Sequence, residues 1–319
     1  MAMSRTCGVF IGDPHYAGRS IGARMDDYAA SISEKMTEAL SIARDYPADY
    51  VCILGDLFHQ PDPPGIVRNE VIRVFVEGNE GERWPFEILT VVGNHDISGQ
   101  TTRTLERTAV ETLNRSGVIR IVNDDPTYDI FAAHYEHDIE SKELESERAI
   151  WAVHAYVLPS SFVGPHVLVD DFHVGPRTRA VISGHWHTGY PVVKRSDGVL
   201  FANPGSIGRP RVDDADHDVK IAVVEYDDDA VDIRYVPLES AKPAKQIFPS
   251  AALVRSDGHK GQDESVFADT LDKLRRNFDT KGDSLTLVER ASDLLQPGAE
   301  VVSEARRRIE DQRKGEDDG

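Results

Sequence analysis

Residues 88–96 read ILTVVGNHD, an apolar run that ends abruptly in polar side chains. Gly93 and Asn94 favour a tight turn, so the stretch predicts a buried strand followed by a loop. The same arrangement occurs twice earlier, at residues 9–15 (VFIGDPH) and residues 50–59 (YVCILGDLFH). In an α/β sheet, the loops that follow the strands build the binding site. These stretches therefore predict a sheet with a site at one of its edges.

Helical stretches separate these strands. We predict helices over 25–43, 64–76 and 102–114, and a further strand over 118–122. The alternation of strand and helix indicates an α/β fold with helices packed on the sheet. In the second half of the chain, the apolar runs are mostly short strands separated by turns, which predicts a second, more antiparallel sheet. The two stacked sheets with their outer helices make one domain over residues 1–240.

The remaining segment, residues 241–319, differs in composition from the first. It holds 14 Lys and Arg against 16 Asp and Glu, whereas the rest of the chain holds 22 against 39. An apolar stripe at helical spacing is formed by Phe267, Leu271, Leu274 and Phe278. We expect a linker and a small, mainly helical extension, with disordered last residues. Its apolar face packs either on the chain's own core or on a partner.

Overall composition limits the class of protein. The net charge of −19 disfavours a general nucleic-acid-binding protein, because such proteins usually present a basic face. No apolar run is long enough to span a membrane, and the first residues do not resemble a signal peptide. Cys7 and Cys52 lie in strand-like runs and are predicted to be buried free thiols. We therefore expect a cytoplasmic protein without membrane association.

Two later strands also end in histidines. His154 follows the run 150–153, and His185 and His187 follow the run 180–183. Five polar clusters at strand ends thus supply Asp, His and Asn side chains, which are ligands that suit Mn²⁺, Fe²⁺ or Zn²⁺. Two such ions, about 3.5–4 Å apart, need a bridging carboxylate and further ligands on each side. The clusters contain enough ligands for a two-ion site.

In their order, these five motifs resemble the calcineurin-like metallophosphoesterases over residues 6–240. The resemblance implies a four-layered α/β sandwich, made of two stacked mixed sheets flanked by helices. It also implies hydrolysis of phosphoesters by a hydroxide that bridges two divalent ions, for which we expect Mn²⁺, with Fe²⁺, Zn²⁺ or Mg²⁺ as alternatives. The implied ligands are Asp13, His15 and His187 for one ion, Asn94, His154 and His185 for the other, and Asp56 as the bridge.

Three further residues match catalytic positions of this family. His95 directly follows an implied ligand and is implied as the acid that protonates the leaving oxygen, with Asp96 orienting it. His59 lies three residues after Asp56. DNA-repair nucleases similar to SbcD carry a histidine there that contacts the substrate phosphate, and the stretch 203–206 (NPGS) also resembles this branch. The resemblance therefore implies a DNA nuclease that works with an SMC-like ATPase, similar to SbcC, bound through the C-terminal helices.

Other interpretations stay open on the sequence alone. The nuclease branch usually carries a larger DNA-binding cap, and the acidic balance offers no obvious face for duplex DNA. The main alternative is a phosphodiesterase or phosphomonoesterase that acts on small molecules or nucleotides. A non-catalytic scaffold is a lesser alternative because no ligand is missing, and a homodimer is compatible with the sequence. Arg209 and Arg211 are further candidates for phosphate contacts, and His134 is a rival of His154.

Overall fold

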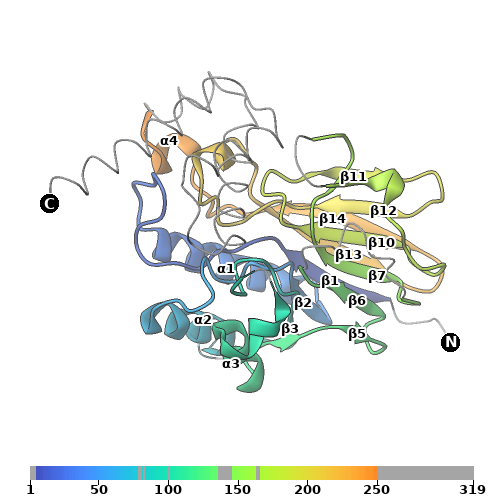
Figure 1. The fold of residues 1–319 in the computed structure, drawn as a ribbon, viewed down its shortest axis with the longest axis horizontal. Coiled ribbons are helices and arrows are strands. Elements are labelled where there is room, and N and C mark those ends of the chain that lie inside the picture. The colour runs from blue at the N-terminus through green and yellow to red at the C-terminus, as the bar shows by residue number, and fades with distance from the viewer. Residues whose placement is uncertain are drawn as a thin grey trace, which may run out of the picture. The chain divides into compact units, whose positions relative to one another are not determined.

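Two six-stranded sheets form the centre of the fold (Figure 1). The computed structural model describes residues 5–77, 81, 83–99, 101–135, 146–162 and 166–250. The sheets lie face to face, because apolar side chains from both pack together in one cluster between them. The predicted architecture of two mixed sheets flanked by helices is thereby confirmed.

The first sheet combines four strands from the start of the chain with the last two described strands. In spatial order these are β14 (Val231–Pro237), β13 (Lys220–Tyr226), β1 (Thr6–Ile11), β2 (Tyr50–Ile53), β3 (Glu87–Thr90) and β4 (Arg120–Ile121). Strands β1 to β4 run parallel, while β13 is antiparallel to both β1 and β14. The carboxyl ends of β1, β2 and β3 therefore meet at one edge of the sheet.

The second sheet is largely parallel, which corrects the expectation of a more antiparallel arrangement. In spatial order it contains β11 (Tyr190–Lys194), β12 (Leu200–Asn203), β10 (Ala180–Gly184), β7 (Ile150–His154), β6 (Ile130–Ala133) and β5 (Asp124–Asp125). Strands β6, β7, β10 and β12 are parallel, and the edge strands β5 and β11 run antiparallel. The runs of β13 and β14, which we assigned to this sheet, extend the first one instead. The described parts of the connections contain no α-helix, so the sequence lacks the helical periodicity that signals a parallel crossover.

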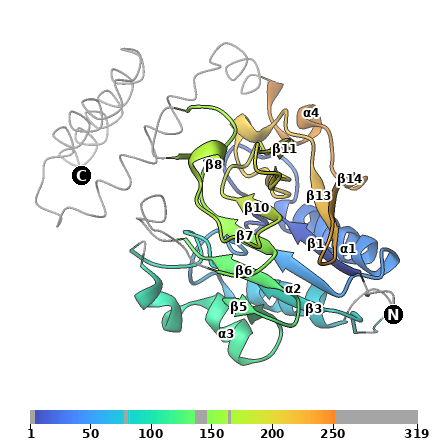
Figure 2. The same ribbon diagram turned by 90° about the vertical axis from the view of Figure 1, so that its right-hand side faces the viewer.

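Helices cover the outer face of the first sheet, beginning with α1 (Tyr28–Asp45) and α2 (Gly65–Glu77) (Figure 2). α1 starts after Asp27, whose carboxylate caps the helix by accepting a hydrogen bond from an N–H of the first turn at 3.2 Å. Side chains of β1 alternate between the two faces of the sheet. Val9 packs among the helices, while Phe10 packs between the sheets. The first sheet is therefore buried on both faces.

The helix predicted over residues 102–114 is divided in two. A 3-10 helix, η1 (Thr102–Arg107), precedes the short α-helix α3 (Ala109–Arg115). Thr108 between them adopts an extended backbone, and its hydroxyl caps α3 by accepting a hydrogen bond from the N–H of Glu111. A threonine hydroxyl that competes for backbone groups favours a helix start over a helix interior, and this explains the division.

A loop covers the outer face of the second sheet within the described residues. It follows the 3-10 helix η2 (Val169–Asp171). The ring of its Phe172 lies edge-on to the rings of Trp151 and Phe201, and its centroid lies 6.3 Å from the first and 6.2 Å from the second. Trp151 and Phe201 are fully buried. Two short strands pair as a small separate sheet beside this loop in the sequence, namely β8 (Val157–Leu158) and β9 (Val167–Leu168).

The described chain ends shortly after α4 (Ala244–Ile247). Ile247 and Phe248 are fully buried and belong to a small apolar cluster. The boundary predicted at residue 240 stays a prediction. The apolar stripe predicted for the C-terminal extension lies outside the described residues.

Two observations bear on the surroundings of the protein. Among the described residues, no helix has both the length and the apolar character needed to cross a membrane. Cys7 and Cys52 are buried and not joined in a disulfide, as predicted. Burial raises the pKa of the Cys7 thiol to about 11, and the nearby carboxylates of Glu225 and Asp49 add to this shift. The thiol therefore stays protonated at neutral pH, as expected for a core residue.

Candidate metal centre

The predicted ligands lie at the carboxyl ends of strands from both sheets. In order along the chain, they close or follow β1 (Asp13, His15), β2 (Asp56), β3 (Asn94), β7 (His154) and β10 (His185, His187). Within each sheet the strands concerned are parallel, so their carboxyl ends share an edge. The stacking of the sheets then brings the two edges together.

The backbone at this edge is strained. Asp13, His15, Asp56 and His185 have positive φ angles of 40°, 51°, 50° and 74°. Such angles are uncommon for residues with a side chain, and each costs about 1–3 kcal/mol. Strain of this kind persists where the surrounding structure enforces it, and it concentrates at functional sites. Its occurrence at four predicted ligands marks this edge as a candidate site.

Two glycines allow the loops to approach one another. Gly55 has a φ of 98°, and a Cβ atom on it would lie 2.2 Å from Nδ1 of His154. A Cβ atom on Gly93 would lie 2.2 Å from a carboxylate oxygen of Asp56. Both distances are far shorter than van der Waals contact. The glycines of the GDLFH and GNHD stretches are therefore required for the ligands to converge.

Three groups of potential ligand atoms occur among the described residues, and the atoms of each group lie within 4.8 Å of one another. Six of the seven predicted ligands fall in two of these groups, and the remaining group contains His15, His59 and His95. Of the two ligand groups, the first contains Asp13, His15, Asp56 and His187, and the second contains Asp56, His154 and His185. Asn94 adjoins the second group, because its Oδ1 lies 3.1 Å from Nε2 of His154. Asp56 occurs in both groups, as a bridging carboxylate would. The structure thus brings all seven residues together, and their role as ligands stays a prediction.

His154 directs a lone pair towards the second group. Its Nδ1 lies 2.6 Å from the carbonyl oxygen of Leu54 and donates to it, so Nε2 of the neutral ring is an acceptor. Burial lowers the pKa of His154, which favours this neutral ring. Nε2 faces two further acceptors, Oδ1 of Asn94 at 3.1 Å and Oδ2 of Asp56 at 3.6 Å. Three acceptor atoms that face one another fit a divalent cation.

Two more imidazoles meet in the first group. Nε2 of His15 lies 3.0 Å from Nε2 of His187 and 3.6 Å from Oδ2 of Asp56. His15 is 1% exposed, and its Nδ1 has no hydrogen-bond partner among the described residues. Burial lowers the pKa of His15 and so favours the neutral form that binds metal. An unsatisfied buried imidazole whose other nitrogen faces a second imidazole fits a shared cation.

Asp13 is held in place by the backbone of the second sheet. The N–H of His185 donates to both of its carboxylate oxygens, at 3.0 and 3.2 Å. Burial raises the pKa of Asp13 to about 6, although the nearby His154 and His187 act in the opposite direction. A bound cation would reverse this shift because it favours the carboxylate form. The donor set of both groups therefore fits divalent ions.

Hydrogen bonds to Asp96 and to the His59 carbonyl hold the loop that carries His95. Asp96, implied as the residue that orients His95, accepts hydrogen bonds from the N–H groups of Gly93 at 2.9 Å and Phe58 at 3.3 Å. The ring Nδ1 of His95 donates to the carbonyl oxygen of His59 at 2.8 Å. Asp96 therefore joins two ligand-bearing loops through their backbone, and the carbonyl of His59 fixes Nδ1 of the His95 ring. The orienting role implied for Asp96 stays a prediction.

His59 lies at the edge of the first group. Its ring stacks on that of His95, with centroids 5.2 Å apart and planes at 26°, and lies edge-on to that of His15 at 5.6 Å. Burial lowers the pKa of His59 to about 4, and the neighbouring His95 acts in the same direction. The structure thus brings three imidazoles together, and the contact of His59 with a substrate phosphate stays a prediction.

Two residues behind the site have structural roles. The guanidinium of Arg209, which is 5% exposed, donates to the carbonyl oxygens of Ala215 at 3.2 Å and Lys242. The buried guanidinium is thus bonded to the backbone, and the phosphate contacts suggested for Arg209 and Arg211 stay predictions. Ser206 of the NPGS stretch donates from its hydroxyl to the carbonyl oxygen of Asp13 at 2.7 Å. The stretch therefore supports the loop that carries the first ligands.

His134 is a structural residue rather than a member of either group. Its Nδ1 accepts a hydrogen bond from the N–H of Val92 at 3.1 Å, and its Nε2 donates to Oδ1 of Asn123 at 3.0 Å. Burial lowers the pKa of His134 to about 4, which keeps the ring neutral for these two bonds. His134 thus joins the end of β6 to the end of β3, and His154 is the histidine that lies among the candidate ligands.

Sequence reasoning missed Asp214, which ends the 3-10 helix η3 (Val212–Asp214). It is 5% exposed, and its Oδ2 lies 3.2 Å from Nδ1 of His187. In the sequence it stands among Asp213, Asp216 and Asp218, a run typical of a solvated acidic surface. No pattern in the run shows that one of these carboxylates is buried.

At the strand ends of the two stacked sheets, Asp, His and Asn side chains gather into two groups that share one carboxylate. This arrangement could hold two metal ions, as in dinuclear hydrolases. The chain belongs to the calcineurin-like phosphoesterase superfamily, since the model of that domain matches residues 9–229. This superfamily is dimetal-dependent. Because the chain belongs to it, the chain is a phosphoesterase. No curated protein matches the sequence.

Several solved structures are similar to this chain. An archaeal phosphodiesterase is 16% identical, with a TM-score of 0.36 over 72% of this chain and 100% of its own. A dimetal phosphatase from Danio rerio is 12% identical, with a TM-score of 0.44 over 73% of this chain and 96% of its own. A metallophosphoesterase from Sphaerobacter thermophilus is 15% identical, with a TM-score of 0.36 over 80% of this chain and 99% of its own. None of these likenesses assigns a substrate.

Proposed function

We propose that this phosphoesterase is a Mn²⁺-dependent DNA nuclease similar to SbcD. The observation that carries the proposal is the place of His59, stacked on His95 at the edge of the first ligand group. An imidazole there can donate a hydrogen bond to a non-bridging phosphate oxygen. Such a contact matters most for a diester with a poor leaving group, and the sugar hydroxyl released from DNA is a poor one.

The chain's own residues have distinct tasks in this reaction. Bound divalent ions would polarise a phosphoryl oxygen and supply a nucleophile at neutral pH. His95 acts as an imidazolium whose Nδ1–H is held by the carbonyl oxygen of His59; it would give its Nε2 proton to the leaving oxygen and become neutral. His59 holds the phosphate through a ring N–H. Asp96 keeps the loops of both imidazoles in position through the backbone N–H groups of Phe58 and Gly93.

The test uses the full chain with Mn²⁺ on single-stranded, duplex and hairpin DNA, with bis-p-nitrophenyl phosphate in parallel. We expect cleavage of DNA that requires Mn²⁺ and that EDTA abolishes. Hydrolysis of the small diester without cleavage of any DNA would favour a phosphodiesterase or phosphomonoesterase for small molecules or nucleotides. A folded chain that binds no metal and hydrolyses neither substrate would favour a non-catalytic scaffold.

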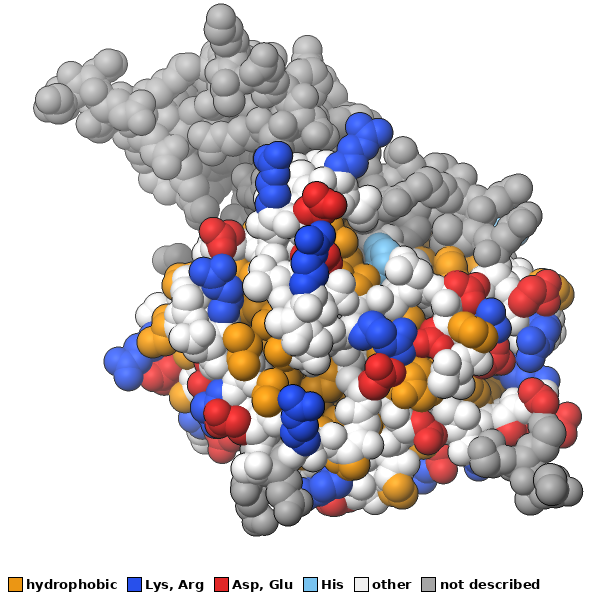
Figure 3. Space-filling view, turned by 90° about the horizontal axis from the view of Figure 1, so that it is seen from below, with side chains coloured by type: hydrophobic (Ala, Val, Ile, Leu, Met, Phe, Trp, Pro, Cys, Tyr) orange, Lys and Arg blue, Asp and Glu red, His pale blue; other side chains and the backbone are white. Residues whose placement is uncertain are grey.

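The surface charge bears on how DNA would be held. The face in Figure 3 intermixes Lys and Arg with Asp and Glu, and its described part shows no continuous basic area. With a net charge of −19, the chain gains little from general attraction to phosphates. The proposal therefore includes a partner, an SMC-like ATPase that docks on residues 241–319 and helps to hold the DNA. A cytoplasmic location is part of the same proposal and agrees with the buried free thiols of Cys7 and Cys52.

A further inference from the structure

Asp214 lies against the side of the His187 ring that faces away from the ligand group. Its Oδ2 lies 3.2 Å from Nδ1 of His187, while Nε2 of the same ring lies 3.0 Å from Nε2 of His15. The backbone N–H of Arg211 donates to the same oxygen of Asp214 at 3.2 Å. Asp214 is therefore fixed by its own turn, and it contacts the candidate ligand from behind without being one of the seven.

The contact joins a carboxylate oxygen to a ring nitrogen. An ionised carboxylate can only accept hydrogen bonds, so Nδ1 of His187 carries the hydrogen and donates it to Oδ2 of Asp214.

A proton held on Nδ1 determines what the other ring nitrogen can do. In a neutral imidazole only one nitrogen carries hydrogen, so Nε2 of His187 then offers its lone pair. We propose that Asp214 is a positioning residue that fixes the tautomer and orientation of His187, and thereby sets the metal affinity of the group formed by Asp13, His15 and His187. This inference rests on the proposed two-ion centre. A carboxylate behind a ligating imidazole also makes that imidazole a stronger donor.

The second ligand group is oriented in a different way. Nδ1 of His154 donates to the carbonyl oxygen of Leu54 at 2.6 Å, which is a neutral backbone acceptor. One histidine is thus held by a carboxylate and the other by a main-chain carbonyl. Loss of Asp214 should therefore weaken the binding of the ion held by His187 and leave the binding of the other ion unchanged. A residue that merely stabilised the fold would affect both ions alike, so the two roles give different results.

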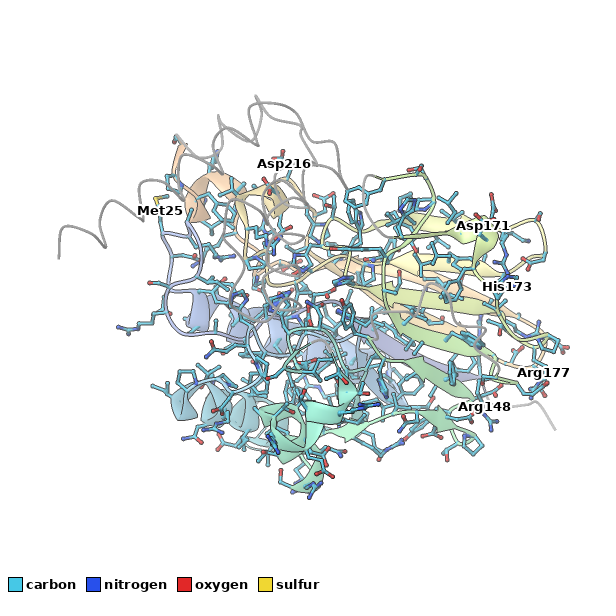
Figure 4. The ribbon with its side chains drawn as sticks, viewed as in Figure 1. Met25, Arg148, Asp171, His173, Arg177 and Asp216 are labelled. Atoms are coloured by element: carbon cyan, nitrogen blue, oxygen red, sulfur yellow. The ribbon has the colours of Figure 1, made fainter. Side chains whose placement is uncertain are left out.

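The experiment compares the variants Asp214→Ala and Asp214→Asn with the wild type. Asp216→Asn is the matched control, because Asp216 lies two residues further on, is exposed, and stands at the periphery of the molecule (Figure 4). Each metal-free protein is equilibrated with a series of free Mn²⁺ concentrations, and bound Mn²⁺ per chain is measured by mass spectrometry. The melting temperature of each metal-free protein is recorded in parallel.

We expect wild type and Asp216→Asn to bind two ions. Asp214→Ala should hold one ion normally and bind the other about 10- to 100-fold more weakly. Asp214→Asn is isosteric and keeps an acceptor oxygen without the charge, so its affinity for this ion should lie between those of the wild type and Asp214→Ala. If Asp214→Ala does not fold, Asp214→Asn still tests the inference.

Three results would overturn the inference. In the first, the Asp214 variants bind both ions as tightly as the wild type. In the second, the affinity for both ions falls to the same extent and the metal-free protein melts at a lower temperature. In the third, the wild type binds no ion, and the two-ion centre then fails along with the role of Asp214.

Discussion

Asp56 belongs to both groups of candidate ligands. Replacing it with Ala should release both ions, because each group loses a carboxylate that it shares with the other. We expect metal analysis to find about two ions per chain in the wild type and none in Asp56→Ala. The matched control is Asp125→Ala, since Asp125 is also buried but pairs with Arg120 at 2.7 Å, and it should keep both ions. Two tightly held ions in Asp56→Ala would refute the assignment.

His95 is expected to act on the leaving group rather than on the metals. His95→Ala should lower turnover by about 10²–10⁴, the usual contribution of a general acid. Metal content should stay unchanged, because His95 contacts the carbonyl of His59 and lies beside the ligand groups. Turnover is measured on a diester with a poor leaving group, and bound metal on the same preparation. A His95→Ala protein that has lost an ion would show that His95 is a ligand.

His59 should matter more for DNA than for an activated ester. Loss of a hydrogen bond to a charged phosphate costs a factor of about 10–100, and an aryl ester needs that help less because its leaving group is good. We therefore expect His59→Ala to lose about 10- to 100-fold on DNA and less on bis-p-nitrophenyl phosphate. The exposed neighbour provides the control, and Gln60→Ala should behave as the wild type on both. Equal losses on the two substrates would count against a phosphate contact specific to DNA.

Single residues differ in how far the sequence alone identifies them. Asp13 and Asn94 could be found because each stands just after an apolar run, where a strand end must expose it to the site. Asp214 and Arg209 could not, because their burial depends on segments distant in sequence that fold over them. A polar residue in a loop looks the same in the sequence whether it is solvated or covered.

At the level of elements, local pattern identified the strands but not their partners. The sequence pattern predicts that β13 is a strand. It does not predict that β13 pairs with β1, which lies more than 200 residues earlier, because this pairing depends on how the whole sheet assembles. The same limit explains the second sheet, whose parallel strands β7 and β10 are joined by short strands and loops in the described chain. Parallel pairing normally reveals itself through an intervening helix. Without one, the sequence suggests an antiparallel sheet.

His134 connects the ends of β6 and β3 and should make stability depend on pH. Burial lowers its pKa to about 4 from the ordinary 6.5, so the folded protein takes up this proton less readily than the unfolded chain. The stabilisation is complete above about pH 6.5 and is lost as the pH falls towards about 4. We expect the metal-free protein to melt at a lower temperature at about pH 5 than at about pH 7, and His134→Gln to show a weaker dependence.

The control for this comparison is the exposed histidine labelled in Figure 4. His173→Gln removes an imidazole without touching the contact between β6 and β3, and it should keep the pH dependence of the wild type. The melting temperature is followed by circular dichroism in metal-free buffers. If His134→Gln loses stability with pH as steeply as the wild type, the ring of His134 is not the group that titrates.

At the scale of the whole molecule, the fold and its family could be predicted, whereas the place where the folded unit ends depends on packing. The change in composition near residue 240 predicts a boundary there, and this boundary stays a prediction. Ile247 and Phe248, which follow it, are buried. Two apolar residues in an otherwise polar stretch give too weak a signal to assign to either side. Packing decides the boundary, and packing is not visible in composition.

Two truncations should separate the catalytic unit from the C-terminal extension. A chain that ends at Ser256 should stay folded, keep both ions and hydrolyse a small diester, but lose association with the proposed ATPase partner. A chain that ends at Pro243 also loses Ile247 and Phe248, whose burial contributes about 1.5–3 kcal/mol each, and should melt at a lower temperature. Circular dichroism and metal analysis check both. Aggregation of the chain that ends at Ser256 would show that the extension belongs to the core.

Each ligand group takes residues from both sheets, and this has a mechanical consequence. The first group joins Asp13 and His15 of the first sheet to His187 of the second, and the second group joins Asp56 to His154 and His185. Bound ions would therefore act as reversible cross-links between the two sheets, at the carboxyl ends of the parallel strands. In an optical trap, the force needed to pull the sheets apart should rise with free Mn²⁺ and fall when the ion is chelated. The tensile strength of the sandwich would then report on metal occupancy one molecule at a time.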